Sequence, residues 1–411
     1  MTTLYTNIAC LAGIGATESA LRGKELAALQ AISNAWLLIE DAAIAGYGDQ
    51  STLPVNKPAN IIDVQGGTIL PAWCDSHTHL VFGASREQEF VDKIKGLSYA
   101  EIAAKGGGIL HSAHQLASLS EDELFRLAWQ RLQEANALGT GAIEIKSGYG
   151  LTVASELKML RVIRRLKEKA AAPIKASFLG AHAYPAAYKE NHEGYLRLIE
   201  EEMLPVIAAE KLADYIDVFC EDGFFSPAET ERILMAGKRY GLKPKMHANQ
   251  LHLSGGVQVG VKHHAISVDH LETMDADAIQ TLASASTIGT LLPTAAFFLR
   301  MAYQPARQLI DAGAAIALAT DFNPGSSPGL NMHFVVSLAC IQMKMLPEEA
   351  INAATINGAA ALELQRITGS ISKGKRADFI ITKPIPSLAY IPYAFSTNQV
   401  QQVLLGGVPV K

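Results

Sequence analysis

Short apolar runs alternate with longer amphipathic stretches between about residues 68 and 321 of this 411-residue chain. This alternation is typical of repeated strand and helix units around a parallel sheet. Eight such runs predict an α/β fold, a TIM-like (β/α)8 barrel. The runs are Thr68–Trp73, Ala142–Lys146, Ile174–Leu179, Tyr215–Phe219, Lys243–His247, Ile266–Asp269, Thr287–Leu292 and Ala315–Ala319.

The amphipathic stretches between these runs are the predicted helices of the barrel. They include Glu121–Leu138, Glu156–Lys169 and Pro227–Tyr240. A doubly wound open sheet would show a similar alternation. We favour the closed barrel because the reactive side chains fall at equivalent positions after the strands.

The two ends of the chain have a different pattern. Residues 36–47 resemble a hairpin, and short strands return at Asp378–Thr382 and Val400–Leu405. Neither end is long enough to bury a core alone, and short isolated strands need partners. We therefore predict that residues 1–67 and 360–411 form one small β-sandwich domain beside a barrel of residues 68–359.

Composition narrows the classes of protein. The chain is 49% hydrophobic and 18% charged with a net charge of −5, which excludes a disordered chain and offers no attraction to nucleic acid or anionic membranes. The four cysteines lie far apart without a CxxC pair, a pattern typical of a reducing cytoplasm. No apolar run reaches the roughly 20 residues that span a bilayer. We predict a cytoplasmic protein without nucleic-acid or membrane partners.

The sequence Asp75-Ser76-His77-Thr78-His79 directly follows the first predicted barrel strand. In an extended segment, residues i and i+2 point to the same side, so His77 and His79 can share one metal ion. An HxH pair alone is also common in ordinary surface sequence. The residues at the other strand ends therefore decide whether this pair belongs to a metal site.

Four further polar residues follow predicted strands: His182 the third, His247 the fifth, His270 the sixth and Asp321 the eighth. Barrel enzymes build their active sites at this face. Three imidazoles and one carboxylate suit zinc or iron, and we predict His77, His79, His247 and Asp321 as the ligands. Such a metal activates water, which favours hydrolysis or deamination.

A second metal ion would need a bridging anionic ligand. No lysine suited to carboxylation follows the fourth predicted strand, where Cys220-Glu221-Asp222 stands. We favour a single ion, and Glu221 is the residue that would change this interpretation.

Several motifs resemble the imidazolonepropionase family of metal-dependent amidohydrolases, and the similarity covers nearly the whole chain. It includes the segments TINGAAAL at 355–362 and GSISKGKRADF at 369–379. The motifs that carry it are HTHLVFGASREQEF at 77–90, GGGI at 106–109, EIKSGYGL at 144–151, FLGAHAYP at 178–185 and ATDFNPGSSP at 319–328.

The resemblance implies hydrolysis of the cyclic amide in 4-imidazolone-5-propanoate to N-formimidoyl-L-glutamate, a step of histidine degradation. It also implies a cytoplasmic homodimer with one Zn²⁺ or Fe²⁺/Fe³⁺ ion per subunit. The family's metal ligands match His77, His79, His247 and Asp321, and its substrate contacts match Arg86, Tyr149, His182 and Gln250. Positions that hold substrate or product match Asn323, Gly325 and Ser326.

Arg86 is the predicted anchor for the propionate tail, because a guanidinium matches a carboxylate through two parallel hydrogen bonds. The alternative for Arg86 is a salt bridge with Glu87 or Glu89 at the barrel rim. Tyr99 is a second candidate for contact with the carboxylate.

Glycines flank two further candidate elements. Tyr149 lies between Gly148 and Gly150, which permit a tight turn that presents the phenol to the site. The run Gly106–Gly108 fits a mobile lid.

Proton transfer is the point where the chain departs from one form of the family, which has a glutamate three residues after the fifth-strand histidine. Gln250 stands there, and an amide cannot transfer a proton. We assign the general base to His270, helped by Asp321. His182 would polarise the ring carbonyl or donate a hydrogen bond to the oxyanion, and the reverse assignment of the two histidines stays open.

Two alternatives compete with this hypothesis. A purine or pyrimidine deaminase would use the same metal chemistry, but Gln250 could not pass a proton to ammonia and a nucleobase has no carboxylate for Arg86. A binding protein that had lost its chemistry should lack a ligand, whereas all four candidates are present.

Overall fold

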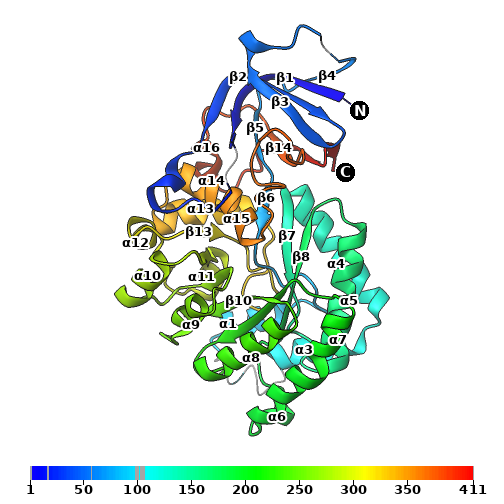
Figure 1. The fold of residues 1–411 in the computed structure, drawn as a ribbon, viewed down its shortest axis with the longest axis vertical. Helices are drawn as coiled ribbons and strands as arrows, with labels where there is room; N and C mark the ends of the chain where they lie inside the picture. Colours follow the sequence, from blue (N-terminus) through cyan, green and yellow to red (C-terminus); the bar gives the residue numbers. More distant parts are fainter. Residues whose placement is uncertain (1, 16–17, 57, 98–100, 102–106, 411) are drawn as a thin grey trace.

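The computed structural model describes residues 2–15, 18–56, 58–97, 101 and 107–410. The described residues form a barrel and a separate sheet, and both chain ends lie at that sheet (Figure 1). Tyr99, a predicted substrate contact, and Gly106 of the predicted lid lie outside the described residues.

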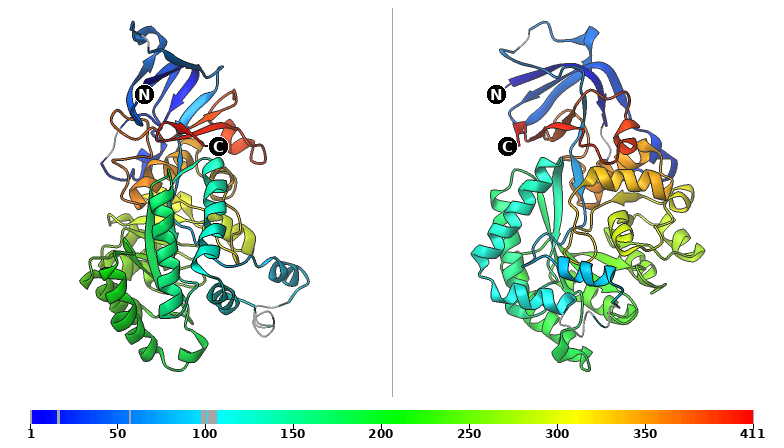
Figure 2. Two further views of the ribbon diagram at one scale, coloured as in Figure 1. Left: turned by 90° about the vertical axis from the view of Figure 1, so that its right-hand side faces the viewer. Right: turned by 180° about the vertical axis from the view of Figure 1, so that it is seen from behind.

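The barrel sheet has eight strands in chain order, and each pairs in parallel with its neighbour. Helices surround it, so the predicted (β/α)8 fold is confirmed (Figure 2). The strands are β6 (Trp73–Asp75), β7 (Thr140–Lys146), β8 (Ile174–Ala181), β9 (Tyr215–Cys220), β10 (Lys243–Ala248), β11 (Ser267–His270), β12 (Ile288–Leu291) and β13 (Ile316–Leu318).

The first predicted strand, Thr68–Trp73, differs from expectation because it is split between the two sheets. Its first half, β5 (Thr68–Pro71), pairs with strands of the terminal sheet, and only β6 joins the barrel. Proline has no N–H to donate, so Pro71 ends the ladder. The backbone N–H of Ala72 then donates to Asp378 O at 3.1 Å before the chain enters the barrel.

The barrel closes beyond the ends of β13 and β6. Asp321 N donates to His77 O at 3.0 Å, and His79 N donates to Phe322 O at 2.8 Å. Below these bonds, Thr320 donates from its N and its Oγ1 to the carboxylate of Asp75, at 3.0 and 2.6 Å. The closure therefore brings two histidines and one aspartate of the predicted site side by side.

The helices around the barrel begin where the sequence supplies caps. Ser120 and Glu123 form a capping box at the start of α4, Ser226 and Glu229 form one at α8, and Thr152 caps α5. The helices are α1 (Glu87–Ile94), α3 (Ile109–Ser118), α4 (Glu121–Ala137), α5 (Val153–Lys169), α6 (His192–Arg197), α7 (Leu204–Ala209), α8 (Pro227–Arg239), α9 (Gly256–Lys262), α10 (Ala276–Ala283), α11 (Pro293–Leu299), α12 (Ala306–Asp311), α13 (Met332–Met343), α14 (Pro347–Ala354), α15 (Ile356–Ala361) and α16 (Tyr390–Tyr393).

Strands from both ends of the chain form the terminal sheet, as predicted. Its path runs β16, β15, β14, β5, β1, β2, β3, with β4 beside β1. Tyr5, Leu11, Phe379 and Leu404 share its buried core. The division of the chain into two domains stays a prediction. The strands are β1 (Thr2–Ala12), β2 (Ala31–Glu40), β3 (Ala43–Asp49), β4 (Asn60–Asp63), β14 (Phe379–Thr382), β15 (Val400–Leu405) and β16 (Val408–Pro409).

Candidate active site

Four predicted ligands meet at the C-terminal end of the barrel. The Nε2 atoms of His79 and His247 are 3.4 Å apart. Asp321 Oδ1 lies 3.4 Å from His77 Nε2 and 3.5 Å from His79 Nε2. All four side chains are almost completely buried.

Buried carboxylates orient two of these imidazole rings. His77 Nδ1 donates to Asp269 Oδ2 at 2.7 Å, and His247 Nδ1 donates to Asp217 Oδ1 at 3.0 Å. A carboxylate on one ring nitrogen fixes the tautomer and leaves the lone pair on the other. The Nε2 atoms of both histidines therefore present lone pairs to the shared centre.

The cluster fits a metal ion because the nitrogen that His77 turns toward it has no hydrogen-bond partner. Among the described residues, His77 Nε2 is buried without a hydrogen bond, which is rare for buried polar atoms. Burial raises the pKa of the Asp321 carboxyl, but the nearby imidazoles of His77 and His79 outweigh burial and hold that pKa well below its usual range. Three imidazole nitrogens and one carboxylate form a donor set typical of zinc or iron.

The backbone at the site is strained. His270 has φ of 86° and Asp321 has φ of 51°, in the left-handed region that residues with a Cβ rarely adopt. Such strain gathers at functional sites, where the surrounding structure enforces it.

The contacts of His270 leave its ring nitrogen Nε2 free to accept a proton. Its Nδ1 lies 3.4 Å from Glu272 Oε1, which also accepts from Gln304 Nε2 at 3.0 Å. A proton on Nδ1 facing this carboxylate leaves the Nε2 lone pair as a base. Sequence reasoning did not identify Glu272, although it stands two residues after His270.

His182 is held by a backbone carbonyl. Its Nδ1 donates to Gly148 O at 3.1 Å, so Nε2 is an acceptor in the neutral ring. Burial, and then the charge of His79, lower the pKa of His182 to about 3. Gly148 permits this approach, since a Cβ there would stand 2.9 Å from His182 Nδ1 at a φ of 108°. A neutral His182 offers Nε2 as a hydrogen-bond acceptor, and its role toward the ring carbonyl or the oxyanion stays a prediction.

A cavity of about 60 Å³, here called the inner chamber, opens onto the cluster. Most of the predicted site residues share it. It is lined by His79, Tyr149, His182, Phe219, His247, Gln250, His270, Asp321, Asn323 and Ser326.

A second cavity of about 590 Å³, here called the outer pocket, shares six of these lining residues, among them Tyr149 and Gln250. It adds two cations, Arg86 and Lys93, and the backbone of Gly325. The two cavities therefore form one path from positive side chains to the histidine cluster.

Arg86 forms a salt bridge beside the outer pocket, which is the alternative that the sequence left open for it. Its Nη2 lies 2.5 Å from Glu89 Oε2, and Glu89 Oε1 accepts from Gly108 N at 2.9 Å. A second guanidinium nitrogen, Nη1, faces Gly325, where a Cβ would stand only 2.3 Å away. Glu89 therefore holds the Nη2 side of the guanidinium in place, and the remainder of the group lines the outer pocket.

Lys93 is a pocket cation that sequence reasoning missed. Its half-buried Nζ lies 3.4 Å from Gly325 O. The signal was its place seven residues after Arg86, since residues i and i+7 lie on one helix face.

Tyr149 and Asn323, two predicted substrate contacts, differ in whether protein atoms already occupy their hydrogen-bonding groups. Tyr149 is buried, and burial raises the pKa of its phenol above the usual range, so the hydroxyl stays a donor. The amide of Asn323 is committed: its Nδ2 donates to Asp321 O and Ser326 Oγ, each at 2.7 Å. Asn323 shapes the turn that carries Ser326 and Gly325.

Glu221 lies apart from the histidine cluster. It accepts from Leu251 N at 2.8 Å and from His252 Nδ1 at 3.1 Å. It thereby fastens the loop that carries Gln250. The residues that could join it around a metal ion are Asp222 and His252.

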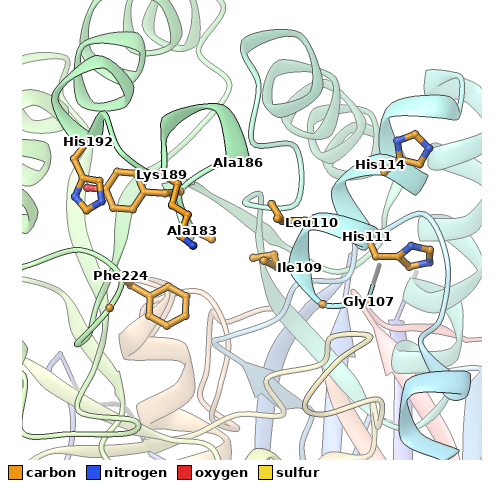
Figure 3. Close-up of a pocket in the computed structure, with 13 residues that line it drawn as sticks. Gly107, Ile109, Leu110, His111, His114, Ala183, Ala186, Lys189, His192 and Phe224 are labelled. Carbon is orange, nitrogen blue, oxygen red and sulfur yellow. The ribbon is translucent and has the colours of Figure 1, made fainter. Parts of the chain in front are cut away.

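A third cavity, of about 700 Å³, is shown in Figure 3 and shares lining residues with the outer pocket. Ile109 and Phe224 line both cavities and point toward each other across the third. Gly107 and Gly108, the described part of the predicted lid, stand at its edge.

Two general features accompany the site. The four cysteines are all unpaired. Among the described residues, no helix has the length and apolar character that crossing a membrane requires.

Comparison with known proteins identifies the family of the chain. Residues 68–410 match the model of the amidohydrolase family. The chain is 56% identical to imidazolonepropionase of Flavobacterium johnsoniae, over 99% of both chains, and 53% identical to that of Christiangramia forsetii, over 99% of both.

Solved structures share the fold at low identity. Guanine deaminase of E. coli superimposes with a TM-score of 0.74 at 14% identity, covering 100% of this chain and 99% of its own. A zinc-bound adenosine deaminase of Xanthomonas campestris gives 0.70 at 16%, covering 99% and 92%.

The chain belongs to the amidohydrolase family. Within that family it belongs to the imidazolonepropionases and is a hydrolase of carbon–nitrogen bonds.

Proposed function

We propose that the protein hydrolyses the cyclic amide of 4-imidazolone-5-propanoate and releases N-formimidoyl-L-glutamate. The observation that carries the proposal is the path from Arg86 and Lys93 to the histidine cluster. A substrate with a carboxylate at one end and a cyclic amide at the other matches both ends of this path.

The propionate tail binds in the outer pocket. Arg86 and Lys93 supply two positive charges there, and charge-assisted hydrogen bonds to a carboxylate are the strong ones. The ring then enters the inner chamber between His182 and Gln250. The Gln250 amide both donates and accepts, so it can bind the polar edge of the ring.

One zinc or iron ion per subunit would be held by His77, His79, His247 and Asp321. When bound, such an ion lowers the pKa of a water molecule and polarises a carbonyl. The orphaned Nε2 of His77 and the two facing Nε2 atoms of His79 and His247 support this ligand set.

His270 takes the proton from the attacking water, helped by Asp321, and passes it to the leaving ring nitrogen. The water oxygen forms a bond to the carbonyl carbon while the carbon–nitrogen bond breaks. The contact of His270 Nδ1 with Glu272 supports this role, because it leaves Nε2 unprotonated.

His182 and Tyr149 orient the ring. The Nε2 of neutral His182 accepts from the ring N–H, and the Tyr149 hydroxyl donates to a substrate oxygen. The bond from His182 Nδ1 to Gly148 O supports the first role, and the raised pKa of the phenol supports the second.

The test is direct. Purified protein of known metal content is mixed with freshly generated imidazolone propionate, the loss of ring absorbance is followed, and the product is identified by mass. We expect formimidoylglutamate, lost on chelation and restored by zinc or iron. Ammonia release from purines or pyrimidines instead would overturn the proposal in favour of a deaminase.

A homodimer in the cytoplasm remains part of the proposal. Unpaired cysteines support a reducing compartment. Light scattering of the purified protein tests the dimer.

A further inference from the structure

A layer of charged side chains fills the barrel beneath the histidine cluster. It consists of Glu144 and Lys146 on β7, Asp217 on β9, Lys245 on β10 and Asp269 on β11, all with no exposed surface. Barrel interiors are usually packed with branched aliphatic side chains. Burying five charges costs desolvation free energy that only good geometry repays. We therefore expect the layer to have a functional role.

Lys146 is the hub of this layer. Its Nζ lies 2.6 Å from Glu144 Oε1, 2.6 Å from Asp217 Oδ2 and 3.5 Å from Asp269 Oδ2. It therefore bridges two carboxylates that come from strands on either side of β10.

Those two carboxylates are the ones that orient the candidate ligands. Asp217 uses its second oxygen, Oδ1, for His247 Nδ1, and Asp269 uses Oδ2 for His77 Nδ1. One ammonium group thus connects to two metal-binding rings through two carboxylates.

Lys245 is a natural comparison inside the same layer. It is equally buried, but its hydrogen bonds go to Glu144, Ser76 O at 3.2 Å and Ala361 O at 3.3 Å. It makes no hydrogen bond to Asp217 or Asp269 among the bonds of the described residues. The two lysines share burial and charge and differ in this connection.

We propose that Lys146 is a positioning residue for metal binding, which holds Asp217 and Asp269 so that His247 and His77 present Nε2 to one ion. The inference rests on the proposed function, because it takes these histidines as ligands. Partners that orient ligand histidines from outside contribute about 10–100-fold to metal affinity.

Two charge-matched double variants isolate the role of Lys146. Glu144→Gln with Lys146→Met, and Glu144→Gln with Lys245→Met, each remove one positive and one negative charge from the same layer. The zinc dissociation constant of metal-stripped protein is measured by competition with a chromophoric chelator. The visible spectrum of the cobalt-loaded protein reports ligand geometry, and circular dichroism with thermal unfolding checks the fold.

We expect the Lys146 variant to bind zinc at least about 10-fold more weakly and to change the cobalt spectrum. The Lys245 variant should stay within about threefold of wild type with its spectrum unchanged. Glu144→Gln with Lys146→Gln, which keeps a donor in the layer, should recover part of the affinity and replaces the methionine variant if that does not fold.

Equal weakening by both lysine variants would overturn the inference, because it would mean general damage to the core. Unchanged or tighter binding in the Lys146 variants would overturn it too. Wild-type protein that binds zinc but leaves imidazolone propionate intact would instead refute the proposed function and leave the Lys146 comparison standing.

Discussion

The inner chamber and the outer pocket hold their polar side chains in different ways. In the inner chamber, His182 and His247 each have Nδ1 fixed by a buried acceptor, and the rings lie at strand ends. In the outer pocket, Arg86 is the N-cap residue of α1 and Lys93 lies in its last turn, and Lys93 is only half-buried.

The difference separates two tasks. Preorganised groups on strands suit bond breaking, because they need no rearrangement as charge develops. Cations on a surface helix suit recognition of one end of a substrate, since they act equally before and during reaction. Inner-chamber variants should therefore lower kcat, and outer-pocket variants should raise KM.

The largest effect is expected from Asp321→Ala in the inner chamber. Removing the carboxylate takes away a predicted ligand and a partner of His77 and His79. We expect kcat to fall by about 10³-fold or more together with loss of bound metal, measured by turnover and elemental analysis. Circular dichroism is the control for folding, and retained metal-dependent turnover would refute the ligand assignment.

Arg86→Met should have the next largest effect, and it should fall on KM. A hydrogen bond to a charged group contributes about 1.5–3 kcal/mol, so we expect kcat/KM to fall by about 10–100-fold with kcat nearly kept. The control is an imidazolone with a propionamide tail, which has no charge for Arg86 to bind. An equal loss on the amide would show that Arg86 acts on the barrel and not on the carboxylate.

Lys93→Met should raise KM by about 5–10-fold, because the variant loses one interaction between a partly exposed ammonium group and the substrate carboxylate. Burial and the neighbouring Arg86 lower the pKa of Lys93 below its usual value. Its charge is therefore lost as the pH rises through that lowered pKa, and KM of wild type should rise in alkaline solution.

The Lys93 variant should lack this alkaline rise. Lys95→Met is the matched control, because Lys95 follows the same helix and does not line the outer pocket. If Lys95→Met raised KM as much, the effect would be one of net charge and the pocket assignment of Lys93 would fail.

The sequence predicted the barrel because it follows from local pattern, whereas Tyr149, Gln250 and Asn323 were named as site residues through the family resemblance. Strand-end histidines and capping boxes are visible in the residues themselves. The split of residues 68–73 was missed because the partner of Ala72 is Asp378, some three hundred residues away. The left-handed backbone of His270 also depends on tertiary packing.

The charged layer was within reach of the sequence and was still missed. Asp217 interrupts a predicted strand, and Lys146 and Asp269 end two others; a charge in a buried strand needs a partner. What the sequence could not supply is the partner, because pairing between β7, β9 and β11 depends on the closed barrel.

Tyr149→Phe tests the boundary between the two regions, because Tyr149 lines both cavities. The variant keeps the ring, whose centroid lies 5.7 Å from that of His79 and 5.4 Å from that of His182, and removes only the hydroxyl. A neutral hydrogen bond contributes about 0.5–1.5 kcal/mol, so we expect kcat/KM to fall by about 2–10-fold. Steady-state kinetics divide the loss: a change in KM alone assigns the hydroxyl to the carboxylate end, and a change in kcat assigns it to the ring. An unchanged kcat/KM would mean that the phenol only packs against the histidines. His182, and not Tyr149, would then be the last residue of the inner chamber that contacts the substrate.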